Sequence, residues 1–194
     1  SAKARGTGIA KRTPEYIRLK MLEGKAVIAL SKTGEWAGFC YIETWSHGNY
    51  VANSGLIVSP NFRKSGLATE IKKKIFELSR AKYPEAKIFG LTTGLAVMKI
   101  NSDLGYEPVT YSELTQDEAF WKGCQSCVNF EILKSKDRKN CLCTAMLYNP
   151  AEKNKPRWFD FVSKQKVMER LLRIKQTNFL KKLKIKKEEP INSL

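Results

Sequence analysis

The sequence predicts a mixed α/β domain in which an antiparallel meander is joined to a parallel pair of strands through a helix. Three short apolar runs, separated by turn residues, occupy most of the first 60 residues, which is typical of a meander. An amphipathic pattern of helical period follows them, and a fourth apolar run comes after that pattern. Because a strand–helix–strand crossover places its two strands parallel, the fourth strand is predicted to run parallel to the third.

The first elements are a helix and the three strands of the meander. Thr13 caps the helix, Pro14 occupies its first turn and Gly24 ends it. A Thr-Gly turn joins the first two strands as a hairpin, and a His-Gly-Asn turn leads into the third. The predicted strands span residues 25–31, 36–45 and 50–59.

The second half of the domain begins with an amphipathic helix over residues 66–81. Its apolar residues recur at helical spacing from Leu67 to Leu78, and three consecutive lysines that begin at Lys72 mostly face away from them. Pro108 lies within the fifth strand and therefore predicts a bulge or an edge position there. The remaining predicted elements are a strand (86–92), a helix (94–104), the fifth strand (106–111), an irregular, partly helical insertion (112–140) and a final strand (141–148).

The compact domain is predicted to span residues 1–150, and a basic helical extension to follow over residues 151–194. The chain has 35 Lys and Arg against 19 Asp and Glu, a net charge of +16, and about half of this excess lies in the extension. The extension packs on the domain, pairs with another subunit or lies on an anionic surface, so a homo-oligomer is left open. We do not expect nucleic acid as the partner, because no aromatic platform or recognised nucleic-acid motif accompanies the lysines.

Cellular location is indicated by the apolar runs and the cysteines. No apolar run approaches the roughly 18–20 residues that a membrane span needs, so no span is expected. The first residues are polar and basic with no apolar stretch behind them, which does not resemble a signal peptide. Five cysteines, an odd number, argue against a disulfide scaffold. We therefore expect a cytoplasmic protein.

The segment over residues 56–69 carries the strongest functional signal. A strand runs into a loop with Arg63, Lys64 and Gly66, and this loop opens the next helix. Helix N-termini present unpaired N–H groups and a partial positive charge, and Gly66 lets a phosphate approach the backbone closely. An ordinary strand-to-helix turn is the alternative on this loop alone. Neither the Walker pattern nor the dinucleotide-binding pattern of glycines is present.

The loop resembles the signature of the GNAT superfamily, the Gcn5-related N-acetyltransferases. Residues 63–68 fit its pattern of Arg or Gln, two residues, Gly, one residue, then Gly or Ala. The resemblance covers roughly residues 13–149 and implies the GNAT acyl-CoA transferase fold, a central mixed twisted sheet flanked by helices. Because only a dozen residues precede the predicted first helix, we expect the first strand of that fold to be missing.

The resemblance also implies acetyl-CoA as co-substrate, wedged between two splayed strands. Backbone of the splayed strand would pair with the pantetheine amides, and an N–H near Ile57 would polarise the thioester carbonyl. Backbone amides of the loop would hold the pyrophosphate. The residues implied are Leu56, Ile57 and Val58 in the strand, Arg63, Lys64, Ser65, Gly66, Leu67, Ala68 and Thr69 in the loop and helix start, and Thr93 in a second family landmark.

Two catalytic functions are needed, a base for the attacking amine and an acid for the departing thiolate. Glu43, on the strand next to the splayed one, is the candidate base, directly or through water. A solvated or ion-paired strand residue is the alternative for Glu43. In the family, a tyrosine often protonates the thiolate, and Asn101 occupies its position here. Water or another phenol, such as Tyr106 or Tyr111, would therefore act as the acid.

More loosely, the chain resembles the transferase domain of N-acetylglutamate synthases, which start arginine biosynthesis. The run Leu-Thr-Thr at 91–93 is the most telling part of this resemblance. It implies an acetyl-CoA-dependent N-acetyltransferase that acts on a small amine, first of all the α-amino group of glutamate, by direct attack in a ternary complex. Arg12, Arg18 and Lys25 are candidates to bind its carboxylates. The alternative is an inert CoA-fold binding module whose basic tail serves nucleic acid or a protein partner.

Four of the five cysteines cluster within twenty residues and suggest a structural zinc site. A C-x-x-C pair is a frequent half-site, and two cysteines one residue apart on a strand point to the same face. Buried apolar thiols are the alternative, because free cysteine behaves as a small hydrophobe. The candidate ligands are Cys124, Cys127, Cys141 and Cys143.

Overall fold

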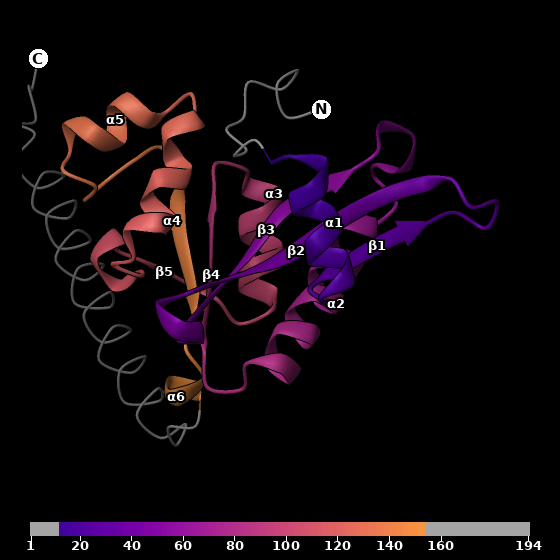
Figure 1. The fold of residues 1–194 in the computed structure, drawn as a ribbon, viewed down its shortest axis with the longest axis horizontal. Helices are drawn as coiled ribbons and strands as arrows, with labels where there is room; N and C mark the ends of the chain where they lie inside the picture. The colour runs from indigo at the N-terminus through magenta and orange to yellow at the C-terminus, as the bar shows by residue number, and fades with distance from the viewer. Residues whose placement is uncertain (1–11, 154–194) are drawn as a thin grey trace, which may run out of the picture. The chain divides into compact units, whose positions relative to one another are not determined.

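The structure is a computed structural model that describes residues 12–153 (Figure 1). The compact unit of the chain ends at Ala151. The predictions for the basic extension lie outside the described residues, apart from its first few positions. The helices and strands are α1 (Pro14–Leu22), β1 (Ala26–Leu30), β2 (Trp36–Trp45), β3 (Tyr50–Val58), α2 (Leu67–Lys82), β4 (Lys87–Thr92), α3 (Leu95–Asp103), β5 (Glu107–Val109), α4 (Glu118–Lys122), α5 (Phe130–Ser135), β6 (Thr144–Tyr148) and α6 (Pro150–Lys153).

The described strands form one six-stranded mixed sheet in the order β1-β2-β3-β4-β6-β5. Strands β1, β2 and β3 make the predicted antiparallel meander, and β4 runs parallel to β3, as the crossover through α2 requires. The short strand β5 lies at the edge of the sheet, which confirms the expectation from Pro108.

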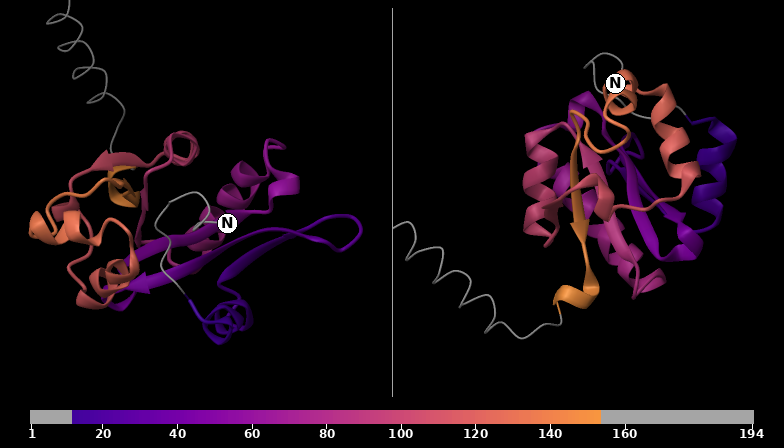
Figure 2. Two further views of the ribbon diagram at one scale, coloured as in Figure 1. Left: turned by 90° about the horizontal axis from the view of Figure 1, so that it is seen from above. Right: turned by 90° about the vertical axis from the view of Figure 1, so that its left-hand side faces the viewer.

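Helices cover both faces of the sheet. Figure 2 shows α2 and α3 on one face, and α1 with α4 on the other. On the first face, Ile71 and Ile75 of α2 are buried in one cluster with Val51 of β3 and Ile88 of β4. A second cluster, centred on Phe89 and Trp121, joins the insertion to the other face. Burial of each such side chain stabilises the fold by roughly 1.5–3 kcal/mol, so the helices on both faces are stably packed on the sheet.

Strands β3 and β4 pair over a short distance and then separate. Their register runs from Tyr50 opposite Lys87 to Ala52 opposite Phe89, and no pairing continues beyond it. On its other edge β3 carries a bulge, because Phe39 faces Ile57 whereas Tyr41 faces Ser54. The bulge bends β3 away from β4, so the sheet opens between them.

Three sequence-based expectations differ from the structure. Lys72 is buried rather than turned outward, because it is three residues before Ile75 and seven before Ser79, on the buried face of α2. Cys141 and Cys143 precede β6 instead of lying within the strand. Strand β5 is limited to three residues, since Pro108 cannot donate to a ladder.

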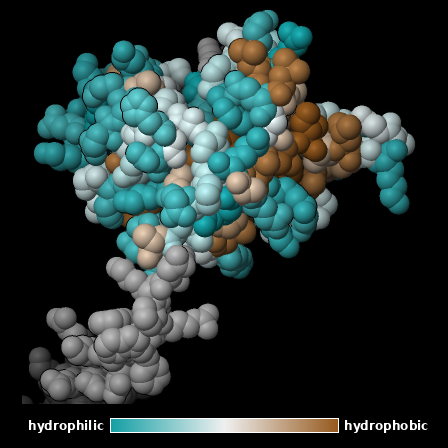
Figure 3. Space-filling view, turned by 60° about the horizontal axis from the view of Figure 1, so that its bottom comes forward, coloured by the Kyte–Doolittle hydropathy of each residue, from teal (hydrophilic) through white to brown (hydrophobic). Residues whose placement is uncertain are grey.

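The hairpin of β1 and β2 carries exposed apolar side chains behind its polar tip. They include Ile28, Leu30 and Trp36. Figure 3 shows a brown, hydrophobic area behind the teal tip of the hairpin. None of the helices in residues 12–153 has the length and apolar character to cross a membrane.

Candidate active site

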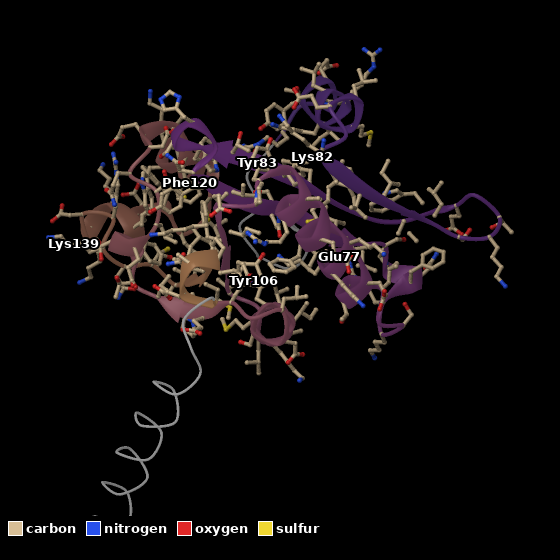
Figure 4. All side chains as sticks on the ribbon, turned by 90° about the horizontal axis from the view of Figure 1, so that it is seen from below. Glu77, Lys82, Tyr83, Tyr106, Phe120 and Lys139 are labelled. Carbon is tan, nitrogen blue, oxygen red and sulfur yellow. The ribbon has the colours of Figure 1, made fainter. Side chains whose placement is uncertain are left out.

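A cavity of about 300 Å³ lies where β3 and β4 separate. Asn53 to Leu56 line it from β3, and Gly90 to Thr92 line it from β4. Lys72 and Asn101 close it from the side of α2 and α3, whereas Arg12 and Phe120 line it from the opposite side. Phe120 is labelled in Figure 4. The cavity therefore passes through the opening in the sheet, and we call it the wedge cavity.

Gly55 allows the bulge that shapes one wall of the wedge cavity. Its φ is +67°, a conformation that side-chain-bearing residues rarely adopt. A Cβ at this position would lie only 2.4 Å from Cε1 of the Tyr41 ring. Both facts demand glycine, so the wall of the cavity at this point is bare backbone.

A second cavity of about 300 Å³ begins at the loop before α2, and we call it the loop cavity. It shares the lining residues Leu56 and Val97 with the wedge cavity, so the two are neighbours along β3. Gly66, with φ +83°, precedes the first turn of α2, and no side chain caps that helix. A Cβ on Gly66 would meet nothing within 4 Å, so open space lies above the helix N-terminus.

Most of the residues that the resemblance implied for acetyl-CoA lie around these two cavities. Ser65 instead turns its hydroxyl back to the carbonyl of Phe62, at 2.7 Å, and Ile57 faces Phe39 in the sheet ladder. Thr93 lines the wedge cavity. The residues that line the loop cavity are Leu56, Val58, Arg63, Lys64, Gly66, Leu67, Ala68 and Thr69.

The floor of the wedge cavity is polar although it is buried. Asn53 accepts a hydrogen bond from the hydroxyl of Tyr106 at 2.9 Å and donates one to Ser79 at 2.7 Å. Asn101 is 1% exposed, and its Oδ1 has no hydrogen-bond partner among the described residues. Lys72 is 2% exposed, and burial lowers its pKa. The floor therefore offers the cavity one hydrogen-bond acceptor, the Oδ1 of Asn101, and one amino group, that of Lys72.

Neither phenol that was considered as the acid lines the wedge cavity. Tyr106, labelled in Figure 4, commits its hydroxyl to Asn53. Tyr111 donates its hydroxyl to the carbonyl of Cys143 at 2.7 Å, next to the insertion. Burial raises the pKa of both phenols, which makes each a weaker acid than an exposed tyrosine.

Glu43 lies behind Arg12 and is itself 4% exposed. Its Oε1 accepts from Nε and Nη2 of Arg12 at 3.2 and 3.1 Å and from the hydroxyl of Tyr16 at 2.6 Å. Burial disfavours the charge of Arg12, but the charge and the hydrogen bond of Glu43, together with Tyr41 and Tyr16, outweigh burial, so the pKa of Arg12 is raised. Of the pair, Arg12 lines the wedge cavity, and Glu43 holds it in place.

The zinc prediction is not supported by the structure. Among residues 12–153, no group of three or more His, Cys, Asp or Glu side chains is arranged to hold a metal ion. Because Cys141 and Cys143 precede β6, the alternation of a strand does not aim them at one point. Cys124 and Cys141 pack against the second core cluster, as the alternative of buried apolar thiols expects.

Sequence reasoning missed three residues of this site. Gly55 interrupts an apolar strand, and a glycine inside a strand often marks a bulge. Lys72 shares helical spacing with Ile75 and Ser79, which could have marked it as buried. No local pattern indicates Asn53, because its partners Ser79 and Tyr106 are distant in the sequence.

Comparison with known proteins agrees with this geometry. The profile of the Acetyltransferase (GNAT) family matches residues 4–96. No curated protein sequence matches the chain significantly. Among solved structures, N-acetylglutamate synthase from Neisseria gonorrhoeae, complexed with coenzyme A and N-acetyl-glutamate, is similar, with a TM-score of 0.54 and 15% identity. The match covers 76% of this chain but only 30% of that one.

A second similar structure is Rv2747 from Mycobacterium tuberculosis, solved in complex with CoA. Its TM-score is 0.52 at 14% identity, and the match covers 73% of this chain and 84% of that one. At such identities these structures indicate the fold alone. The six-stranded mixed sheet with its opening between β3 and β4 has the GNAT acetyltransferase fold, and the profile of that family matches residues 4–96 of the chain.

Proposed function

We propose that the chain is an acetyl-CoA-dependent N-acetyltransferase that acetylates a small amine bearing a carboxylate. The observation that carries this proposal is the opening between β3 and β4, which leads from the loop cavity through the sheet to Arg12. A long, thin ligand with an anionic end and an amide-containing arm fits such a path. Acetyl-CoA has this shape, and the family match makes it the expected co-substrate.

The pyrophosphate of acetyl-CoA would lie over the start of α2. The uncapped helix N-terminus offers N–H groups and positive potential, and Arg63 and Lys64 add charge beside it. The pantetheine arm would follow β3 from Val58 toward Gly55, where β4 no longer pairs with the strand. Backbone amides freed by the separation would hydrogen-bond its two amides, and an N–H near Ile57 would polarise the thioester carbonyl.

Arg12 is proposed to bind the acceptor's carboxylate. It faces the wedge cavity on the side opposite α2 and α3, and Glu43 and Tyr16 fix its position from behind. A guanidinium binds a carboxylate through paired N–H donors, which orients a small acidic amino acid. Glutamate is the first candidate for the acceptor. Its acetylation would be a step of arginine biosynthesis, in the reducing cytoplasm.

Glu43 has two proposed roles that kinetics can separate. As the base it would take a proton from the attacking ammonium, directly or through water. As a positioning residue it would hold Arg12. Glu43→Gln should lower kcat with little change in the acceptor KM if Glu43 is the base. A raised acceptor KM with kcat largely kept would assign it to positioning.

The binding of CoA is tested by calorimetric titration with acetyl-CoA and with ATP as a nucleotide control. Gly66→Glu should abolish acetyl-CoA binding, because it adds bulk and negative charge above the helix N-terminus. Gly34→Glu is the matched control, since Gly34 also has a positive φ, +82°, with nothing within 4 Å of its Cβ, but lies in the remote hairpin turn. Equal affinity for acetyl-CoA in both variants would overturn the loop assignment.

The acceptor is tested by thiol release from acetyl-CoA with L-glutamate, L-aspartate, L-glutamine and a simple alkylamine. Acidic amino acids should react fastest, and Arg12→Ala should raise their KM while sparing the alkylamine. Binding of acetyl-CoA without thiol release to any acceptor or to water would favour the inert binding module instead.

A further inference from the structure

We propose that Lys72 is the acid that protonates the thiolate of CoA as it departs. This inference rests on the acetyl-transfer function proposed above and assigns a catalytic residue within it. Lys72 belongs to the second turn of α2, behind the open part of β3, and lines the floor of the wedge cavity.

The surroundings of Lys72 are unusual for a lysine. It is 2% exposed, and its Nζ has no ion pair or hydrogen bond within residues 12–153. Its Nζ lies 5.5 Å from the centre of the Tyr106 ring, and the buried thiol of Cys40 is near. A buried ammonium without a counter-charge is costly, so a developing anion in the cavity would be strongly stabilised there.

Asn101 supplies an independent sign that a ligand group belongs at this place. Its Nδ2 donates a hydrogen bond to the sulfur of Met146 at 3.8 Å, and its Oδ1 is buried without a partner among the described residues. A buried carbonyl oxygen that accepts no hydrogen bond is rare and calls for a donor. Asn101 and Lys72 line the same cavity, so a thiol S–H or an amide N–H of the ligand can satisfy the oxygen there.

Acetyl transfer needs a proton donor near the sulfur of the thioester, because the sulfur departs as a thiolate. The amine forms a bond to the carbonyl carbon, the C–S bond breaks, and the sulfur leaves with the electron pair. The ammonium of Lys72 gives its proton to that thiolate, which leaves as the thiol. The neutral amine of Lys72 then takes a proton from solvent when CoA departs. On the opposite side, the acceptor nitrogen gives its surplus protons to Glu43, directly or through water.

Burial makes this transfer more favourable than it would be from an exposed lysine. An exposed lysine, with a pKa of about 10.4, is a weaker acid than a thiol of about 8.5, so it would not give up its proton readily. Burial lowers the pKa of Lys72 and therefore makes its ammonium a stronger acid. The same burial favours the neutral amine that the transfer leaves behind.

Other proton donors that face the cavity are less suited. Arg12 does not deprotonate in proteins. Burial raises the pKa of Tyr41 to about 12, and its phenol lies beside Arg12 and Glu43 rather than at the floor. Lys72 is therefore the acid that the lining offers on the side of α2 and α3.

The test compares acetyl-CoA with acetyl-seleno-CoA, whose selenolate is a much weaker base and departs without a proton. Lys72→Met should lower kcat with acetyl-CoA by about 100-fold or more, and KM for acetyl-CoA should change little. With the selenoester, the same variant should retain most of the parental rate. Lys73→Met, an exposed lysine on the same helix, is the matched control and should leave both rates unchanged.

A second variant separates proton donation from charge. Lys72→Arg keeps the positive charge but cannot give up its proton, so its kcat should be as low as that of Lys72→Met. Calorimetry with acetyl-CoA checks that each variant is folded. Parental kcat in Lys72→Arg, or equal losses with both esters in Lys72→Met, would overturn the acid role while leaving the transferase intact. A parent protein that binds no acetyl-CoA would overturn the proposed function itself.

Discussion

Gly55 combines two constraints that can be measured separately. Its φ of +67° disfavours any side chain, and the Tyr41 ring occupies the space of a Cβ. Gly55→Ala should therefore destabilise the fold by the cost of the backbone strain, about 1–3 kcal/mol, and by that of the clash. Gly34→Ala carries a similar φ without any contact, so the difference between the two variants in urea unfolding isolates the clash. Equal losses of stability would show that Tyr41 moves aside freely.

Lys72 should leave a signature in the pH dependence of stability. Burial lowers its pKa in the folded state below the unfolded value of about 10.5, so the unfolded chain binds more protons between these two values. Stability should therefore rise with pH across that window as the charge penalty disappears. Lys72→Met should be more stable than the parent at pH 7, and its advantage should shrink toward pH 10. Urea unfolding at both pH values measures this, and an unchanged difference would contradict a lowered pKa.

Among the elements, β3 and β4 determine where the ligand enters. They pair only from Tyr50 to Ala52 on β3, and beyond that point backbone groups of β3 face the wedge cavity. Acetyl-CoA should slow hydrogen exchange in residues 53–58, because its pantetheine amides would replace the missing strand partners. The β1–β2 hairpin should be unaffected and serves as the internal control. Slowed exchange in the hairpin without slowing in residues 53–58 would place the ligand elsewhere.

The elements that the sequence predicts well are those with a local signal. The meander, the crossover helix and the edge position of β5 follow from period, turn residues and Pro108. The bulge at Gly55 and the floor of the wedge cavity depend on contacts between distant segments, such as Tyr106 with Asn53, which no local pattern records. The same holds for Glu43, whose partners Arg12 and Tyr16 come from the start of the chain.

At the scale of the whole molecule, half of the net positive charge lies outside the part of the sequence that lines the two cavities. Residues 154–194 contain twelve Lys and Arg and four Asp and Glu, half of the net charge of +16. The residues that line the wedge and loop cavities all lie between Arg12 and Cys143. The basic extension and the cofactor path therefore use separate parts of the sequence, and their anion-binding properties should be separable.

Removal of residues 154–194 tests this separation. Acetyl-CoA affinity should stay within about twofold of the parental value, since Arg63, Lys64 and the start of α2 remain. Retention on heparin should fall, and its dependence on salt should weaken, because fewer cations are left to release counterions from a polyanion. The comparison uses calorimetry with acetyl-CoA and heparin elution at two ionic strengths. A collapse of acetyl-CoA affinity, after circular dichroism shows an intact fold, would instead make the extension part of the cofactor site.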